Sequence, residues 1–311
     1  MITWDKEAAA AKAARGTFAG KAVRIDVYRN NAEIFHEGGY RTDSGRDVLL
    51  PVDDPMLEGT RVYSAPLRVD GAPAVREPLF TDVLNEDALI VAKNLADKGY
   101  RPAVLNLADG YTACGFYPRG SRAQEESLCR VSTLSRSLYR LYDEEHAREV
   151  NVPFVGGGYP MDRRNGGIYS PGVTVFRDAK DSYRLLDEPF KVSVISVAAL
   201  DFSERQGRDL AFRLPDGGID PEGLDILREK IRTIHRICLD NGHDSLVAGA
   251  FGCGAFRLPA ETVAGLFRDI LDEPEFAGKF RAVVFAILER GTRTSTAERG
   301  KFAPFYRLFA R

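Results

Sequence analysis

The alternation of helical patterns with short apolar stretches is the feature of this sequence that most restricts its fold. It begins near residue 85 and continues to the C-terminus. Strands that are apolar on both faces need cover on both sides, so the alternation predicts an α/β fold in which helices sandwich a sheet. Ligands of such sheets usually bind beyond the carboxyl ends of the strands. The expected strands are 103–107, 152–155, 173–176, 191–198, 245–250 and 281–288.

The first 84 residues have a different character. The N-terminal 45 or so residues predict helices with one strand-like piece at 23–27, where apolar residues alternate. Residues 48–82 are rich in proline and contain a short predicted strand at 61–64. We therefore expect an N-terminal extension, 1–84, packed on a core domain, 85–311.

Composition limits the partners of the chain. With 311 residues and 44% hydrophobic content it can bury a sizeable core. The 43 basic and 45 acidic residues nearly cancel, and a net charge of -2 gives no electrostatic reason for general nucleic-acid or membrane binding. An anionic ligand is still compatible with this balance, because helix N-termini and loop N–H groups bind phosphate without excess Lys or Arg.

The four cysteines, Cys114, Cys129, Cys238 and Cys253, form no C-x-x-C pair and have no histidine at metal-binding spacing. We expect free thiols in a reducing compartment, and neither a metal nor another cofactor. The N-terminus lacks the apolar core of a signal peptide, and no apolar stretch approaches membrane-spanning length. The expected location is cytoplasmic.

The segment from 105 to 126 carries the first candidate chemistry. A predicted strand leads into a loop, which delivers Glu125 and Glu126 to the first turn of a helix that continues to Leu141. Acids in a first turn can simply complement the helix dipole, and Gln124 can be only the partner of a Ser121 cap. Neighbouring helical side chains point about 100° apart. One carboxylate can therefore face a reacting bond while the other holds substrate hydroxyls.

The segment from 247 to 259 is glycine-rich and joins a predicted strand to a helix near Pro259. Glycines let backbone N–H groups approach a pyrophosphate closely, and the helix N-terminus adds a positive dipole end. A tight strand-to-helix turn that needs glycine for positive φ would produce the same sequence pattern.

Several motifs in order resemble the bacterial form of poly(ADP-ribose) glycohydrolase. The chain has Val104-Leu105-Asn106 and then Gln124-Glu125-Glu126, where that family has a strand ending in L-N-F-A, a glycine triplet, six to eight residues and Q-E-E. Further matches cover nearly the whole chain. They are Gly38-Gly39-Tyr40, Ile168 to Val173, Phe176-Arg177-Asp178, Val194 to Ala199, and the loop from Gly249 to Phe256.

The resemblance implies a macrodomain-like mixed sheet between helices, with ADP-ribose as the ligand. Asn106 would contact the distal ribose, Glu125 would position it, and Glu126 would be the catalytic acid. The diphosphate and adjoining ribose would be wrapped by Gly252, Cys253, Gly254, Ala255 and Phe256.

One loop departs from the family pattern. Where the family has P-G-G-G, this chain has Ala113-Cys114-Gly115-Phe116. A left-handed backbone at Cys114 or Phe116 would cost roughly 1–2 kcal/mol per residue. The ring of Phe116 would also stand where the family leaves room for ribose and phosphate. Asp109 lies in the same loop, near the expected distal ribose, although with Gly110 it can equally form a turn.

These features predict an ADP-ribosyl glycohydrolase that cleaves the ribose C1″ bond of poly- or mono-ADP-ribosylated substrates. The substrate would be ADP-ribose attached to protein or nucleic acid. A non-catalytic ADP-ribose-binding protein is the alternative: the intact Gln124-Glu125-Glu126 favours the enzyme, and the two missing glycines favour the binding protein.

Overall fold

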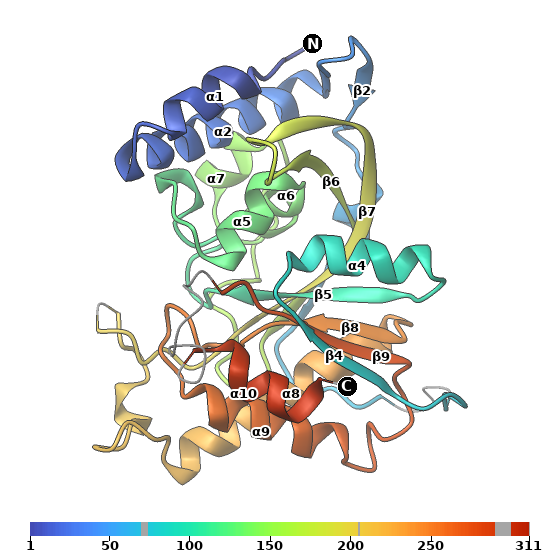
Figure 1. Ribbon diagram of the computed structural model, residues 1–311, viewed down its shortest axis with the longest axis vertical. Coiled ribbons are helices and arrows are strands. Elements are labelled where there is room, and N and C mark those ends of the chain that lie inside the picture. The colour runs from blue at the N-terminus through green and yellow to red at the C-terminus, as the bar shows by residue number, and fades with distance from the viewer. Residues whose placement is uncertain (70–73, 205, 290–299, 311) are drawn as a thin grey trace. The chain divides into compact units, whose positions relative to one another are not determined.

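The structure is a computed structural model that describes residues 1–69, 74–204, 206–289 and 300–310 (Figure 1). The helices are α1 (Lys6–Ala13), α2 (Thr17–Glu37), α3 (Pro55–Gly59), α4 (Ala88–Asp97), η1 (Tyr117–Arg119), α5 (Gln124–Val131), α6 (Leu134–Tyr139), α7 (Glu144–Glu149), η2 (Leu210–Phe212), α8 (Pro221–Asp240), α9 (Ala260–Leu271) and α10 (Phe302–Phe309). The strands are β1 (Gly39–Arg41), β2 (Asp47–Leu49), β3 (Arg61–Tyr63), β4 (Phe80–Leu84), β5 (Pro102–Ala108), β6 (Gly167–Asp178), β7 (Arg184–Ala198), β8 (Ser245–Ala248) and β9 (Ala282–Ala286).

The chain forms two compact units, each assembled from separate stretches of sequence. Unit 1 comprises Met1–Val62, Ala108–Pro160 and Ser170–Val194. Unit 2 comprises Tyr63–Leu107, Met161–Tyr169 and Ile195–Arg311. The larger sheet has seven strands in the order β3-β6-β7-β5-β8-β9-β4, and β1 and β2 form a separate antiparallel pair.

Four neighbouring strands of unit 2 are parallel. Pro102, Ser245, Ala282 and Phe80 stand in one row across β5, β8, β9 and β4. In Figure 1, α4 covers one face of these strands, and α8, α9 and α10 cover the other. The α/β fold expected from the alternation is thus confirmed. Because parallel strands end at the same edge, the residues that follow β5 and β8 emerge together.

Asp220 and Pro221 mark the start of helix α8. The side chain of Asp220 caps Gly223 N at 2.7 Å, and Pro221 occupies the first turn. Its buried face includes Leu227, Ile231 and Ile234, which are fully buried in the core of unit 2.

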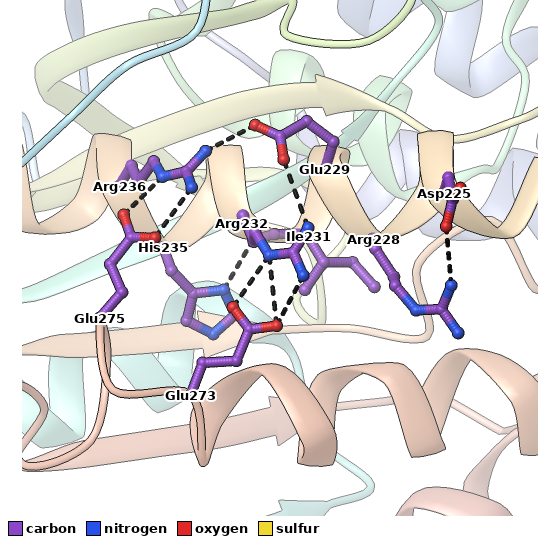
Figure 2. Close-up of polar contacts among 9 residues, drawn as sticks. All are labelled: Asp225, Arg228, Glu229, Ile231, Arg232, His235, Arg236, Glu273 and Glu275. Atoms are coloured by element: carbon purple, nitrogen blue, oxygen red, sulfur yellow. Dashed lines mark hydrogen bonds and ion pairs between the residues drawn. The ribbon is translucent and has the colours of Figure 1, made fainter.

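The polar face of α8 carries a network of ion pairs (Figure 2). Arg236 binds Glu275 through two nitrogens, at 2.6 and 2.8 Å, and Glu229 at 2.6 Å. Arg232 binds Glu273 at 2.7 Å. These bidentate pairs tie the middle of α8 to the segment that follows α9.

In unit 1, the predicted strand at 23–27 is wrong, because these residues lie inside α2. Val23 and Val27 are four residues apart and both pack with Ala9 of α1. Five residues with alternating apolar side chains fit one face of a helix as well as a strand. Packing against α1 therefore decides the conformation.

The long helix expected from residue 121 to 141 is interrupted. Ser132 is extended (φ -143°) and bridges Val175 of β6, and Thr133 N donates to Thr174 O at 2.9 Å. The Ser132 hydroxyl also donates to Leu128 O at 2.7 Å. These polar groups pair the chain with β6 and end α5 at Val131.

The N-cap of α4 is Asp87, whose carboxylate accepts from Leu89 N at 2.9 Å. Asn85, two residues earlier, exchanges hydrogen bonds with the backbone of Glu289.

The expectation of a strand at 152–155 is corrected. Residues 152–155 form no strand. Proline at 153 lacks an N–H donor, and the segment's next two side chains, Phe154 and Val155, are exposed.

Candidate active site

Helix α5, which carries the two predicted acids, starts at Gln124. Its N-cap is Ala123, so the Ser121 capping box predicted from the sequence is wrong. The carbonyl of Ser121 instead accepts from the guanidinium of Arg130. Gln124 is consequently the first residue of the helix.

Glu125 and Glu126 are both buried, with 3% and 4% of their surfaces exposed. Glu125 Oε2 accepts from the backbone of Asp109 at 2.9 Å, and Glu126 Oε1 accepts from the backbone of Phe116 at 3.0 Å. The structure thus brings the Asp109–Phe116 loop onto the first turn of α5. Among the described residues, Glu126 Oε2 is buried and has no hydrogen-bond partner.

The loop itself is shaped by Asp109 and Gly115. Asp109 Oδ1 accepts from Tyr111 N and Thr112 N, at 2.8 and 3.0 Å, so this carboxylate forms a turn. Gly115 has φ +51°, and a Cβ there would lie 2.7 Å from Glu126 Oε1. Only glycine permits the loop to approach the carboxylate this closely.

The two departures from the glycine triplet behave differently. Cys114 adopts a left-handed backbone with φ 57°, whereas Phe116 does not (φ -97°). The Cys114 side chain is fully buried, and burial, followed by a hydrogen bond with the Cys129 thiol, raises the pKa of Cys114 well above its ordinary value. Any contact of Cys114 with a ligand would therefore come from its backbone. Phe116 is 40% exposed.

A buried network on α2 supports this loop, and sequence reasoning missed it. Asn31 Nδ2 donates to Tyr117 Oη at 2.7 Å and to Arg130 O at 2.9 Å, and Asn31 Oδ1 accepts from Arg177 Nε at 2.7 Å. Burial lowers the pKa of Arg177 to about 9. Arg130 Nη1 in turn donates to Glu126 O at 3.0 Å. One asparagine thus connects both sides of the segment that carries Glu126.

Unit 1 also contains a tyrosine that sequence reasoning overlooked. The Tyr159 hydroxyl is buried and, within the described part of the chain, has no hydrogen-bond partner. Burial and then the nearby Glu125 carboxylate raise the pKa of Tyr159 well above its ordinary value. The neutral phenol is therefore its stable form.

In unit 2, Asn106 lies within β5, and the glycine-rich loop follows the neighbouring parallel strand β8. Asn106 of β5 is fully buried and donates from Nδ2 to Ser196 Oγ at 3.0 Å, which fixes its amide. Gly252 has φ +72°, and a Cβ there would lie 2.5 Å from Leu258 Cδ1. The turn therefore requires glycine at 252. At Gly254, by contrast, the one described atom that a Cβ would meet within 4 Å is Lys301 Nζ, at 3.9 Å.

The exposed part of this loop offers backbone donors. Within the described ranges, the N–H groups of Gly254, Ala255 and Phe256 have no hydrogen-bond acceptor. Lys301, a residue that no sequence pattern marked, places its ammonium beside them. The side chain of Cys253 is directed inward, and burial raises its pKa to about 12. Successive free N–H groups beside a lysine form a suitable anion site.

A cavity of about 440 Å³ lies elsewhere in unit 2. Its lining includes Arg101, Asp244 and Arg281, which immediately precede β5, β8 and β9. It therefore lies at the amino ends of the strands, opposite the edge that carries the glycine-rich loop.

The described residues show neither a metal-binding cluster nor a membrane-spanning helix. No group of three or more His, Cys, Asp or Glu side chains there could hold a metal ion. No described helix is both long enough and apolar enough to cross a membrane. All four cysteines are free, as expected.

Comparison with known proteins agrees with this geometry. Residues 29–178 match the family described as "Microbial-type PARG, catalytic domain". The structure resembles poly(ADP-ribose) glycohydrolase from Thermomonospora curvata, with a TM-score of 0.72 and 29% identity over 92% of this chain and 99% of that one. No curated protein matches the chain.

Two ligand-bound relatives are also similar. The Thermomonospora curvata enzyme bound to the inhibitor ADP-HPD is 30% identical, with a TM-score of 0.70 and the same coverage. The Deinococcus radiodurans enzyme in complex with ADP-ribose is 28% identical, with a TM-score of 0.62 over 84% of this chain and 98% of that one. The likenesses confirm the macrodomain-like mixed sheet, and the chain belongs to the microbial-type poly(ADP-ribose) glycohydrolase family of glycosidase-type hydrolases.

Proposed function

We propose that this ADP-ribosyl glycohydrolase cleaves the ribose C1″ bond with Glu126 as its general acid and base. One observation carries the proposal: Glu126 is buried, one carboxylate oxygen is held by the Phe116 N–H, and the other has no partner among the described residues. A carboxyl group fixed at one oxygen and unengaged at the other is suited to move a proton.

The reaction follows from this arrangement. Glu126 would protonate the leaving oxygen at C1″, an oxocarbenium-like state would form, and the same carboxylate would then activate water. Glu125 is held by the backbone of Asp109, so it is suited to position the distal ribose rather than to exchange protons. Gln124, at the first position of α5, would assist substrate binding.

Binding energy would come from groups remote from the cleaved bond. The free N–H groups of Gly254, Ala255 and Phe256, with the Lys301 ammonium, would hold the diphosphate. Gly252 would shape the turn, and Cys253 would contribute its backbone. Interactions with non-reacting parts of a substrate can support distortion and orientation at the reacting centre.

The alternative of a non-catalytic binding protein is disfavoured by the altered loop. Cys114 keeps a left-handed backbone, at a cost of roughly 1–2 kcal/mol. The loop therefore retains the conformation that lets Gly115 and Phe116 approach Glu126. A chain selected only for binding has no evident need to keep this strained approach to a buried acid.

Glu126→Gln tests the proposal, because it keeps size and hydrogen bonding but removes the titrating proton. We expect hydrolysis of poly- and mono-ADP-ribosylated substrates to fall about 10²–10⁴-fold. Calorimetry should show that ADP-ribose still binds. Near-normal turnover would assign the proton transfer to another group, with Asp109 the first to examine.

The substrate and setting form the remaining part of the proposal. We expect ADP-ribosylated protein or nucleic acid as substrate, with 85–311 as catalytic domain and 1–84 as an extension packed on it. The free thiols of all four cysteines support a reducing, cytoplasmic location.

A further inference from the structure

Four cations of unit 1 surround Gly120, close to the catalytic loop. Arg24 of α2 donates from Nε to Gly120 O at 2.7 Å. A Cβ at Gly120 would lie 3.3 Å from Lys21 Cγ, so the stem of Lys21 packs against this residue. Arg119 and Arg122 flank Gly120 in the chain, and both are exposed. We call Lys21, Arg24, Arg119 and Arg122 the Gly120 patch.

Most of the positive charge of the Gly120 patch is not balanced by a neighbouring carboxylate among the described residues. Among the described residues, no carboxylate lies within ion-pair distance of Lys21, Arg119 or Arg122. Lys12, in contrast, pairs with Asp26 of α2 at 2.5 Å. A chain with net charge -2 thus holds a local concentration of positive charge beside its catalytic loop. Such a patch attracts polyanions locally even though the whole protein does not.

An exposed ring adjoins the patch. The guanidinium carbon of Arg119 lies 5.5 Å from the centroid of the Phe116 ring, which is 40% exposed. The backbone N–H of Phe116 contacts Glu126 Oε1 at 3.0 Å. An aromatic ring combined with arginine and lysine is the combination that binds single-stranded nucleic acid, through base stacking and phosphate attraction. Here that combination begins at the catalytic carboxylate.

We propose that Phe116 and the Gly120 patch bind the leaving group, and that this group is the phosphorylated end of a nucleic-acid strand. The inference rests on the proposed function. Glu126 protonates the phosphate oxygen as the C1″–O bond breaks, and the electron pair of that bond stays on this oxygen. Water then forms the new C1″–O bond and returns its proton to Glu126. The products are ADP-ribose and a terminal phosphate monoester.

Other leaving groups fit the patch less well. An amino-acid side chain supplies neither a base for Phe116 nor a phosphate for Arg119. In poly(ADP-ribose), the leaving oxygen is a ribose hydroxyl, and its phosphates are further along the chain. A terminal nucleic-acid phosphate carries its negative charge at the cleaved bond itself, and the Arg119 guanidinium lies over the ring of Phe116, the residue whose backbone N–H holds Glu126.

The test compares three substrates: 5′-ADP-ribosylated single-stranded DNA, poly(ADP-ribose) and a mono-ADP-ribosylated serine peptide. In Arg119→Ala, Arg122→Ala and Phe116→Leu, the ratio of kcat/KM for DNA to that for peptide should fall at least about tenfold, since each variant removes a stacking or phosphate contact. Phe116→Trp should keep the ratio. Phe18→Ala and Arg29→Ala, at exposed positions of α2 outside the patch, are the matched controls.

Binding gives a second readout that does not depend on turnover. Fluorescence anisotropy with a 5′-phosphorylated single-stranded oligonucleotide should show binding that weakens as salt is added. The logarithm of the binding constant falls linearly with the logarithm of the salt concentration, and each arginine removed should lower the magnitude of that slope by about 0.7. If the wild-type protein hydrolyses none of the substrates but binds in this way, the proposed function fails and the subsite stands.

Three results would overturn the subsite. Equal losses on all substrates would mean that Phe116 only supports the loop. A selective loss on poly(ADP-ribose) would assign the patch to the next unit of that polymer. An unchanged DNA-to-peptide ratio, with oligonucleotide binding that the variants do not weaken, would leave the patch without a role in recognition.

Discussion

The backbone N–H of Phe116 donates to Glu126 Oε1 at 3.0 Å. The contact fixes one oxygen of the Glu126 carboxylate, the proposed general acid, by main chain alone. The geometry of that carboxylate therefore depends on the path of the loop rather than on the Phe116 side chain. Gly115 sets that path, because a Cβ there would collide with the same oxygen.

Gly115→Ala should therefore impair catalysis more than folding. The new methyl group would lie 2.7 Å from Glu126 Oε1 and 3.4 Å from Glu125 Oε2. Misplacement of a catalytic group by about 1 Å can lower the rate on the order of 10²-fold, and we expect a loss of that order in kcat. Gly217→Ala is the matched control: it carries φ +88° with no atom within 4 Å. Similar loss of activity in both variants would mean that general backbone strain is responsible.

The two departures from the glycine triplet can be reversed together. Cys114→Gly with Phe116→Gly removes the left-handed cysteine and the exposed ring, so hydrolysis of poly(ADP-ribose) should rise. Adding Glu126→Gln in the same background should abolish the gain. A wild-type protein that already degrades the polymer as efficiently as a relative with three glycines would show that the loop is not limiting.

The ion pairs of α8 should differ in their contributions to stability. The side chains of Arg236 and Glu229 are 13% and 17% exposed, whereas those of Arg228 and Asp225 are 39% and 63% exposed (Figure 2). Breaking a largely buried pair leaves a carboxylate poorly solvated, so Arg236→Ala should cost about 2–4 kcal/mol. Arg228→Ala should cost at most about 0.5 kcal/mol. Urea unfolding of both variants measures the difference, and equal costs would contradict this account.

His235 should make the protein sensitive to acid. It is fully buried among Phe267, Phe276 and Phe280, and burial lowers its pKa to about 4. Histidine in the unfolded chain titrates near 6.5, so the unfolded state binds a proton first as the pH falls. Stability is thus fully present above about pH 6.5 and decreases toward pH 4, by about 3 kcal/mol in total.

His235→Leu should remove this part of the pH dependence. Unfolding free energies measured between pH 4 and 7 test the expectation, and His36→Gln, at an exposed histidine, should keep the wild-type slope. If the unfolding free energy of His235→Leu depends on pH as steeply as that of the wild type, the acid sensitivity comes from other groups.

Sequence patterns predicted those elements whose signals are local. Asp220 and Pro221 mark the start of α8. The apolar run at 103–107 lies within β5, and the run at 245–250 contains β8. The patterns failed where packing decides between conformations of similar local energy. Residues 23–27 are helical because Val23 and Val27 meet α1, and the predicted long helix ends where Ser132 pairs with β6.

The candidate site, too, was predictable where its sequence signal is local and not where it depends on contacts between distant residues. Adjacent glutamates after a strand and loop were visible as a motif, and the glycine-rich loop was visible by composition. Asn31 and Lys301 were not visible, since they lie far along the chain from the loops that they approach. Nothing in the residues around Asn31 distinguishes it from other helix asparagines. Its role depends on which groups the fold brings to it.

The anchoring of the catalytic loop by α2 has a consequence for how this enzyme can be shortened. Asn31 holds Tyr117 and the carbonyl of Arg130, and Arg24 holds Gly120. A polypeptide that began at residue 85 would keep Glu126 and the glycine-rich loop but lose these restraints. We expect such a truncated polypeptide to be inactive because its loop is unsupported, so the smallest working enzyme must retain Arg24 and Asn31 of α2.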